Sequence, residues 1–405
     1  MTLRARLLSA ISSVALLFTT LLLLFLLGEA ALRLAPWWSD RSGDPPFNPY
    51  RPDGRTGFAL RPGADTVHST KEFSVAVHVN ALGLRGPERT LGKPPHTARI
   101  LVLGDSFAFG FGVGQEETFS AELERLLRER GFRVEVLSSG VPGWSLDNEL
   151  VYLRTEGFDL EPDLILVATC ENDLSDLAWN RLTLDDERLP VRIEATRRMI
   201  DPKGRMRYVN EGRYALPALA FPGQAWLEDH SRVYHFVRFR LTKLFAALSA
   251  RADRPAPPAW VGLEPARPIE SLSQEEIQLA LASSDAFELR YHRFLAAAAE
   301  RLAAERGIPV RTLLISARGS LPAPESAVEG LHRDCHARPA TCLDANDVLG
   351  RADDGSPYFF HTDPHWNAAG HRRIAEALAD WLAKEPALKV GATPAAAASL
   401  PGTPP

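Results

Sequence analysis

The segment Ile100-Leu101-Val102-Leu103-Gly104-Asp105-Ser106 is the most informative part of the sequence about the fold. Four apolar residues followed directly by Gly-Asp-Ser are typical of a buried strand that ends at a strand-to-helix corner. A serine at such a corner is exposed at the carboxyl edge of a sheet, where its own backbone N–H can help to bind an oxyanion. The tripeptide alone is weak evidence, because a serine in this position also caps the following helix in many proteins.

Other short apolar runs, each next to an amphipathic helical stretch, follow the same rhythm along the chain. The runs are Val134–Leu137, Leu164–Ala168 and Val310–Ile315, and helices are expected at 116–130, 146–156, 288–306 and 368–384. Strands that are apolar throughout and alternate with helices predict a parallel sheet covered on both faces, which is a three-layer α/β sandwich. In such sheets the functional residues lie just after the carboxyl ends of the strands.

Polar residues follow the other predicted strands at the edge where Ser106 is expected. Gly140 comes after the second strand, and its N–H can approach a ligand closely because no side chain intervenes. Asn172 comes after the third strand, and its carboxamide can donate to a developing negative charge. Near the C-terminus, Asp363 stands two residues before His365. The set comprises a nucleophile, oxyanion donors and a base with an orienting acid.

These four segments, in this order, resemble the sequence blocks of the SGNH hydrolases, the superfamily of GDSL-like lipases, esterases and acyltransferases, in its membrane-anchored bacterial type. The resemblance implies a flavodoxin-like SGNH fold with Ser106 as nucleophile, His365 as its base and Asp363 as the orienting acid. It also implies an oxyanion hole formed by Ser106, Gly140 and Asn172. Neither a cofactor nor a metal is expected for this chemistry.

Two departures from the family's pattern bear on the site. Asp363-Pro364-His365 is shorter than the usual Asp-x-x-His and looks similar to the alginate O-acetyltransferase branch, and backbone carbonyls orient the imidazole in some members. The third block usually begins with Gly, whereas Glu171 precedes Asn172 here, so Glu171 is expected to narrow the pocket or to add a charge beside it. Upstream, Asn80–Gly86 looks like a segment found ahead of the serine block in membrane-anchored members.

The resemblance implies acyl transfer through a covalent intermediate. The expected function is a serine-dependent ester hydrolase or O-acyltransferase acting on acylated carbohydrate or another cell-envelope ester. The alternative is a catalytically silent SGNH-like protein that binds envelope polysaccharide or assists its assembly. The complete set Ser106, Asn172 and His365 argues against this alternative. The sequence specifies neither the substrate, nor hydrolysis over transfer, nor the oligomeric state.

The N-terminal residues 1–30 predict a transmembrane anchor. No charge occurs between Leu7 and Gly28, and 16 of the 21 residues from Leu7 to Leu27 are apolar. A helix of that length covers roughly 30 Å, the thickness of the hydrocarbon core. Arg4 and Arg6 precede the run, so the N-terminus is expected in the cytoplasm and the catalytic domain outside it, in the periplasm or at the cell surface. A cleaved signal peptide is the competing interpretation.

Composition bounds the remaining organisation of the 405 residues. With 46 basic and 51 acidic residues the formal charge is −5, so a nucleic-acid binder that relies on a global positive field is excluded. We expect a juxtamembrane lead-in with a short strand at 31–95, an SGNH hydrolase domain at 96–385 and a disordered tail at 386–405. An insertion or cap is expected at about 181–285. Its helix at 230–251 is expected to pack over the active site or, alternatively, to rest on anionic headgroups.

Several other residues invite a functional interpretation. Cys335 and Cys342 are expected in a polar loop, and in an exported protein a disulfide between them is favoured over free thiols or metal binding. His371 is expected on the surface of the last helix, so a metal site built on its neighbours is disfavoured. The tryptophans Trp144, Trp179 and Trp366 can stack on sugar rings, but core packing is favoured for each of them.

Overall fold

A computed structural model describes most of the chain. The described residues are 3–34, 47–70, 72–195, 198–200, 206–208, 256–263, 265–317, 326–350, 356–361 and 363–391, with single residues between 227 and 237. Contacts divide the chain into two compact units, one comprising Met1–Gly43 with Asn210–Asp253 and the other Asp44–Val209 with Arg254–Pro405. The helix expected at 230–251 lies outside the described residues except for single positions.

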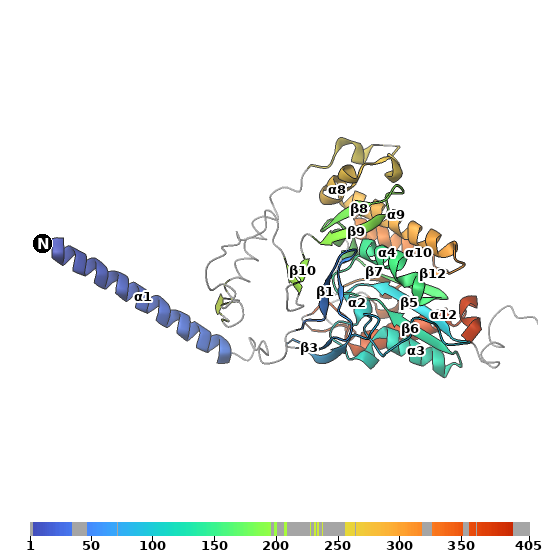
Figure 1. The fold of residues 1–405 in the computed structure, drawn as a ribbon, viewed down its shortest axis with the longest axis horizontal. Helices are drawn as coiled ribbons and strands as arrows, with labels where there is room; N and C mark the ends of the chain where they lie inside the picture. The colour runs from blue at the N-terminus through green and yellow to red at the C-terminus, as the bar shows by residue number, and fades with distance from the viewer. Residues whose placement is uncertain are drawn as a thin grey trace, which may run out of the picture. The chain divides into compact units, whose positions relative to one another are not determined.

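The second unit is built on a five-stranded parallel sheet (Figure 1). Its strands are β5 (Ala98–Gly104), β6 (Val134–Ser138), β7 (Leu164–Cys170), β12 (Val310–Ile315) and β13 (Cys342–Asp344). The spatial order β13-β12-β7-β5-β6 is the flavodoxin-like order 2-1-3-4-5 when the strands are numbered along the chain. The predicted α/β sandwich with a parallel sheet is therefore confirmed, and β13 is a fifth strand that the apolar pattern did not reveal.

Helices cover both faces of this sheet. On one face lie α3 (Phe119–Glu129) and α12 (Ala368–Leu382), and on the other lie α4 (Leu146–Thr155) and α9 (Asp285–Ala304). Successive side chains of a strand point to opposite faces. Ile100 and Val102 of β5 accordingly join the core beneath α3 and α12, whereas Leu101 and Leu103 join the core beneath α4 and α9. This explains why the central strands are apolar throughout.

Shorter elements complete the described part of this unit. The remaining α-helices are α2 (Ser106–Phe109), α5 (Asn172–Leu177), α8 (Gln274–Ser283), α10 (Ala327–His336) and α11 (Ala345–Leu349). Single 3-10 turns occur at η2 (Gln115–Glu117), η3 (Gly157–Leu160), η4 (Ala259–Gly262), η5 (Ile269–Ser271) and η6 (Pro386–Gly391).

The region expected as a lead-in is more structured than its composition suggests. Residues 47–95 form two antiparallel pairs, β1 (Tyr50–Asp53) with β2 (Gly57–Leu60) and β3 (Asp65–Ser69) with β4 (Ser74–His78). The strand expected at 73–79 corresponds to β4. The Pro- and Gly-rich segments form the turns of these hairpins, and the apolar residues of the strands alternate. One face of β2 can therefore pack inward, and Phe58 is buried in the same core as α4. This region therefore belongs to the compact unit of the sheet.

Part of the expected insertion extends the layer of α4 and α9. It contains the antiparallel pairs β8 (Asn180–Leu184) with β9 (Pro190–Ala195) and β10 (Arg198–Ile200) with β11 (Met206–Tyr208). Gln278 of α8 binds β8 at both ends of its amide: it accepts from the Leu182 N–H at 3.1 Å and donates to the Asn180 carbonyl at 2.7 Å. These strands pack beside the core layer.

The prediction of a disordered tail from residue 386 is wrong for residues 386–391. Residues Pro386–Gly391 form η6, and Leu388 is fully buried. One leucine in an otherwise small-residue segment suffices to dock the turn, because its side chain joins the core beneath α3 and α12. Residues 392–405 lie outside the described part of the chain.

In the first unit, α1 spans Leu3–Leu34. Its segment Ser12–Leu32, with a mean hydropathy of 2.2, is long and apolar enough to cross a membrane. A signal sequence has the same property, so attachment to a membrane is treated below as a proposal. Glu29 near the end of the helix accepts hydrogen bonds from the Ser231 hydroxyl at 3.0 Å and the Val233 N–H at 3.1 Å.

Candidate active site

The site begins where β5 ends. Gly104 closes the strand, where a Cβ atom would lie 2.6 Å from the Ala108 side chain, so only glycine fits there. Asp105 caps α2 by accepting the Phe107 N–H at 2.9 Å. The first N–H groups of a helix have no partner within the helix. Ser106, the first residue of α2, therefore presents its hydroxyl and its N–H together at the sheet edge.

The structure brings Ser106, His365 and Asp363 together. The Ser106 Oγ lies 2.7 Å from His365 Nε2, and His365 Nδ1 lies 2.6 Å from Asp363 Oδ1. Asp363 Oδ1 also accepts the backbone N–H of His365 at 3.0 Å. A carboxylate on Nδ1 favours the tautomer with its proton there, which leaves the Nε2 lone pair for the serine hydroxyl. The shortened Asp-Pro-His spacing thus still places the carboxylate on the imidazole.

The environment of Asp363 keeps it ionised. Burial alone raises the pKa of this carboxyl, but the hydrogen bonds and charge of His365 outweigh burial and hold its pKa below the ordinary value. An ionised carboxylate at neutral pH is the state required to stabilise an imidazolium on His365.

The loop that carries Asp363 and His365 is fixed from both ends. Asn367 caps α12 by accepting the Ala369 and Gly370 N–H groups, and its amide donates to the Phe359 carbonyl at 2.9 Å. Glu72, from the β3–β4 connection, accepts the His361 N–H at 2.6 Å. These contacts orient the imidazole before any substrate binds.

Aromatic side chains surround the imidazole, and they were not predicted from the sequence. Phe111 stacks on His365 with ring centroids 4.4 Å apart, and Phe107 lies at 4.8 Å. His68 of β3 meets Phe111 at 4.3 Å, and burial lowers the pKa of His68 to about 4, so it is neutral. The alternating phenylalanines after Gly104 were the available signal, but the contribution of β3 could not be read from local sequence.

Gly140 lies directly against α2. A Cβ atom there would be 2.2 Å from the Phe109 backbone nitrogen, so no other residue fits without moving the helix that begins at Ser106. Ser138 donates to the Ala108 carbonyl at 2.7 Å, and the Val141 N–H donates to the Gly104 carbonyl at 3.1 Å. The Gly140 N–H itself makes only a long contact of 3.4 Å with Ser138 Oγ. It remains available to a stronger acceptor.

Asn172 opens α5 immediately after β7, and it is exposed. Its Nδ2 lies 3.2 Å from Asp176 Oδ2 and 3.5 Å from Asp105 Oδ2. Asp105 Oδ2 is also 3.3 Å from the Ser106 hydroxyl. Both hydrogens of the amide therefore face carboxylates through long contacts. If the amide donated to an oxyanion, that hydrogen bond would replace one of the two long contacts.

Glu171 does not line the pocket as expected. It is buried and lies 2.9 Å from His332 Nε2, while His332 Nδ1 lies 2.6 Å from Asp344 Oδ2. The two carboxylates raise the pKa of His332 to about 10, so the imidazole is charged. The Glu171 charge is neutralised beneath the site instead of being added to it, because α10 places His332 against the end of β7.

The segment Asn80–Gly86 contributes through Arg85, which is almost fully buried. Its guanidinium donates to the carbonyls of Phe109 at 2.8 Å, Gly110 at 2.5 Å and Val113 at 2.6 Å. Burial lowers the pKa of Arg85 to about 10, which leaves it charged at neutral pH. Arg85 thus fixes the loop that follows α2, the helix of Ser106.

Other expectations are corrected or placed by the structure. Cys335 lies on α10 and Cys342 on β13, not in a polar loop, and a disulfide joins them. His371 is buried between Phe119 and Trp366, not on the surface, because the start of α12 packs against α3. Burial lowers its pKa to about 3.

The tryptophans considered as sugar-stacking residues differ in burial. Trp144 and Trp366 are core residues, while Trp179 is half-buried. Among the residues that the structure describes, no group of three His, Cys, Asp or Glu is placed to hold a metal ion.

A buried carboxyl on α4 stands out behind the site. Glu149 is fully buried, and neither of its carboxyl oxygens has a hydrogen-bond partner within the described structure. Burial, together with the nearby charges of Asp105 and Asp147, raises its pKa well above the ordinary value. Glu149 is therefore a neutral acid in the folded protein at neutral pH.

One family model matches the C-terminal part of the chain. Residues 290–402 match the family model ALGX, described as an SGNH hydrolase-like domain of the acetyltransferase AlgX. The matched segment contains Asp363 and His365 but not Ser106. No curated protein sequence matches the chain.

Similar solved structures are distant. They include AlinE4, an SGNH-hydrolase family esterase (15% identity, 73% of this chain, 98% of that chain, TM-score 0.33). Another is LAE5, an alpha/beta hydrolase enzyme from the Lake Arreo metagenome (14% identity, 73% of this chain, 97% of that chain, TM-score 0.32). A third is the lipase/acylhydrolase from Enterococcus faecalis (14% identity, 70% of this chain, 95% of that chain, TM-score 0.25). Nothing about the activity of this chain follows from these likenesses.

Proposed function

Because the chain carries an SGNH hydrolase-like domain, we propose that it is a serine-dependent enzyme that hydrolyses an ester or transfers its acyl group through an acyl-enzyme. The observation that carries this proposal is the continuous hydrogen-bonded chain from Ser106 through His365 to Asp363. Such a chain couples a nucleophile to a base with a fixed tautomer, and a purely structural serine does not require it.

The proposed reaction has two halves. His365 Nε2 takes the proton of Ser106 as Oγ attacks the ester carbonyl, and the imidazolium then returns a proton to the departing alcohol. Water or a sugar hydroxyl, deprotonated by the same imidazole, next attacks the acyl-serine; the bond to Ser106 Oγ breaks, the imidazolium returns the proton to Oγ, and the acyl group leaves on the attacking oxygen. In both halves the charge on the tetrahedral oxygen is stabilised by the Ser106 and Gly140 N–H groups and by the Asn172 amide.

We place the substrate among acylated carbohydrates or other cell-envelope esters. Two features support this choice: the matched family model is that of an acetyltransferase domain, and α1 carries a span suited to a membrane. Anchored by α1, with Arg4 and Arg6 on the cytoplasmic side, the enzyme would present its catalytic unit in the periplasm or at the cell surface.

Labelling by a fluorophosphonate tests whether the serine is reactive. The native protein is expected to be labelled, and Ser106→Ala is expected to lose the label together with about 10³-fold or more in kcat on an ester that the native protein cleaves. Ser145→Ala, a change of a buried serine outside the triad, serves as the control and is expected to keep the label. An unlabelled native protein, beside a labelled control esterase, would indicate the silent polysaccharide-binding alternative.

A second experiment separates hydrolysis from transfer. The native protein is supplied with an isotopically labelled acetyl ester, with and without candidate glycans, and the destination of the acetyl group is followed by mass spectrometry. Label on the glycan that depends on Ser106 indicates transfer, and free acetate alone indicates hydrolysis.

A further inference from the structure

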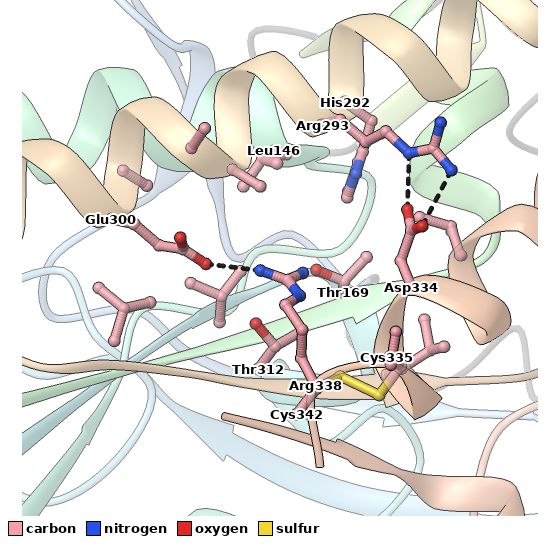
Figure 2. Close-up of a pocket in the computed structure, with 18 residues that line it drawn as sticks. Leu146, Thr169, His292, Arg293, Glu300, Thr312, Asp334, Cys335, Arg338 and Cys342 are labelled. Atoms are coloured by element: carbon pink, nitrogen blue, oxygen red, sulfur yellow. Dashed lines mark hydrogen bonds and ion pairs between the residues drawn. A yellow bond between two sulfur atoms is a disulfide. The ribbon is translucent and has the colours of Figure 1, made fainter. Parts of the chain in front are cut away.

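A cavity of about 320 Å³ lies between α9 and α10, over the sheet (Figure 2). Its floor consists of Val167 and Thr169 of β7 and Val310, Thr312 and Leu314 of β12. Alternate residues of a strand share one face, and the register pairs Thr312 with Val167 and Leu314 with Thr169. Among the described residues that line this α9–α10 cavity, none belongs to the Ser106–His365–Asp363 chain.

The cavity exists because α9 turns small side chains toward the sheet. Ala296 and Ala299 line it, in a helix segment that reads Leu-Ala-Ala-Ala-Ala. Two ion pairs of α9 flank these alanines, one with α10 and one with the segment just after it. Arg293 binds Asp334 through two hydrogen bonds of 2.6 and 2.9 Å, and Arg338 binds Glu300 at 3.0 Å. Protein interiors are normally close-packed, so an unfilled space between these pairs is a candidate ligand site.

One polar side chain points into the cavity without a partner. His292 lies one turn before Ala296 on the same helical face, and its ring is directed into the cavity in Figure 2. It is 5% exposed, and its Nε2 has no hydrogen-bond partner. Burial lowers the pKa of His292 to about 4, so the ring is neutral. A buried polar atom without a partner is costly, and a ligand group that binds it gains correspondingly.

The lining selects the chemistry of the ligand. The charged groups around the cavity are paired with one another, so the walls offer no free charge to an ionic ligand, and burying an unpaired charge is strongly unfavourable. A hydroxyl both donates and accepts, so it suits His292 Nε2 in either tautomer. An apolar cavity of about 150 Å³ holds benzene, and this one is about twice as large. That size suits a chain of about eight carbons.

We propose that the α9–α10 cavity binds a neutral aliphatic alcohol of about eight carbons, with the hydroxyl on His292 and the chain between the alanines of α9 and the floor of β7 and β12. This site is separate from the proposed acyl-transfer site. Its occupation does not require Ser106.

Photolabelling of the full-length protein in lipid nanodiscs tests the proposal. The probe is a diazirine analogue of 1-octanol, labelled peptides are mapped by mass spectrometry, and 1-octanol or octanoate is added as competitor. We expect saturable labelling of peptides covering 292–300 and 331–338, displaced by 1-octanol and not by octanoate. Labelling should be the same in Ser106→Ala. Loss of the label in Ser106→Ala would place the probe in the catalytic site and overturn the proposal.

Matched variants on one helix locate the site. Ala299→Leu fills the cavity and is expected to reduce labelling about tenfold or more, whereas Ala304→Leu, at the exposed end of α9, should leave it unchanged. His292→Leu removes the hydroxyl's partner and should weaken competition by 1-octanol about 5- to 10-fold. Thermal unfolding checks that each variant is folded, and Ala296→Val replaces Ala299→Leu if the latter is not. Labelling that does not saturate, or that is equal in folded Ala299→Leu and Ala304→Leu, would contradict the site.

Discussion

At the scale of single residues, the site depends on contacts between side chains far apart in sequence. Ser106 and His365 are separated by 259 positions, yet their reactive atoms lie 2.7 Å apart. Of the three residues in this hydrogen-bonded series, Asp363 most needs an experimental test, because its spacing to His365 is unusual. Its hydrogen bond of 2.6 Å to His365 Nδ1 is its principal link to the proposed reaction.

Asp363→Asn is expected to reduce kcat by about 10³- to 10⁴-fold with little change in KM. The amide leaves the geometry intact but favours the wrong tautomer of His365, so Nε2 no longer accepts the serine proton. Steady-state kinetics on a chromogenic acetyl ester measures the effect. Asp65→Asn, which changes an exposed carboxyl paired with His78, is the control. A decrease below about tenfold would show that a backbone carbonyl orients the imidazole instead.

Ser106, Gly140 and Asn172 could be grouped from the sequence because each follows a predicted strand, and parallel strands end at a common edge. Asp363 and His365 follow no predicted strand, and only the resemblance to a known family assigned them to the site. The same reasoning could not find His68 or Glu72, which come from a hairpin outside the sheet. It also misjudged Glu171, because its partner His332 lies 161 positions away on a helix whose packing no local pattern reveals.

At the scale of secondary-structure elements, α4 combines a structural and an electrostatic role. Its first turn directly follows the connection from β6 that carries Gly140, and the same turn carries the buried carboxyl of Glu149. The helix was predictable from its apolar residues. The burial of Glu149 was not, because α5, α9 and β9 pack around α4 and its polar residues are buried together with its apolar ones.

Glu149→Gln is expected to stabilise the protein increasingly as pH rises. Burial raises the pKa of the folded glutamate, so above about pH 4.5 the unfolded chain loses a proton that the folded chain retains, and stability falls with pH. Glutamine does not titrate and escapes this loss. Urea unfolding at about pH 5 and about pH 8 measures the difference, with the exposed Glu116→Gln as control. A gap between variant and native protein that narrows toward pH 8 would contradict the prediction.

The disulfide between α10 and β13 is expected to contribute to stability through loop closure. Its cysteines are seven positions apart, for which chain entropy gives about 2.5 kcal/mol. Cys335→Ser with Cys342→Ser should lower the free energy of unfolding by about that amount in denaturant titrations without reductant. The same titration with reductant should abolish the difference between native protein and variant. Equal stabilities under oxidising conditions would show that the bridge is absent from the folded protein.

At the scale of the whole molecule, the chain separates into a unit that contains α1 and a unit that contains the parallel sheet. The sheet-containing unit begins at Asp44, well before the boundary of 96 that the apolar rhythm suggested, and it excludes Asn210–Asp253. The difference arises because the early hairpins bury alternate residues against α4 and β9, contacts that only the folded chain reveals.

Removal of residues 1–43 is expected to leave a folded enzyme that no longer sediments with membranes. Ester hydrolysis by the truncated protein should stay within about twofold of the native value, since the triad and its supports lie in the second unit. Fractionation and kinetics measure both properties. A further truncation to residue 96 removes Glu72 and Arg85 and is expected to abolish activity. Equal activity of the two truncations would show that the hairpins do not support the site.

The short strand β13 has a consequence for how the protein is prepared. Three residues pair it with β12, and the disulfide from Cys342 to α10 ties it in place. In a reducing cytosol the disulfide does not form, so β13 can detach and leave β12 as an exposed edge strand. Exposed edge strands pair with strands of other molecules. Material overproduced in the cytosol should therefore aggregate, whereas material secreted through an oxidising compartment should remain monodisperse.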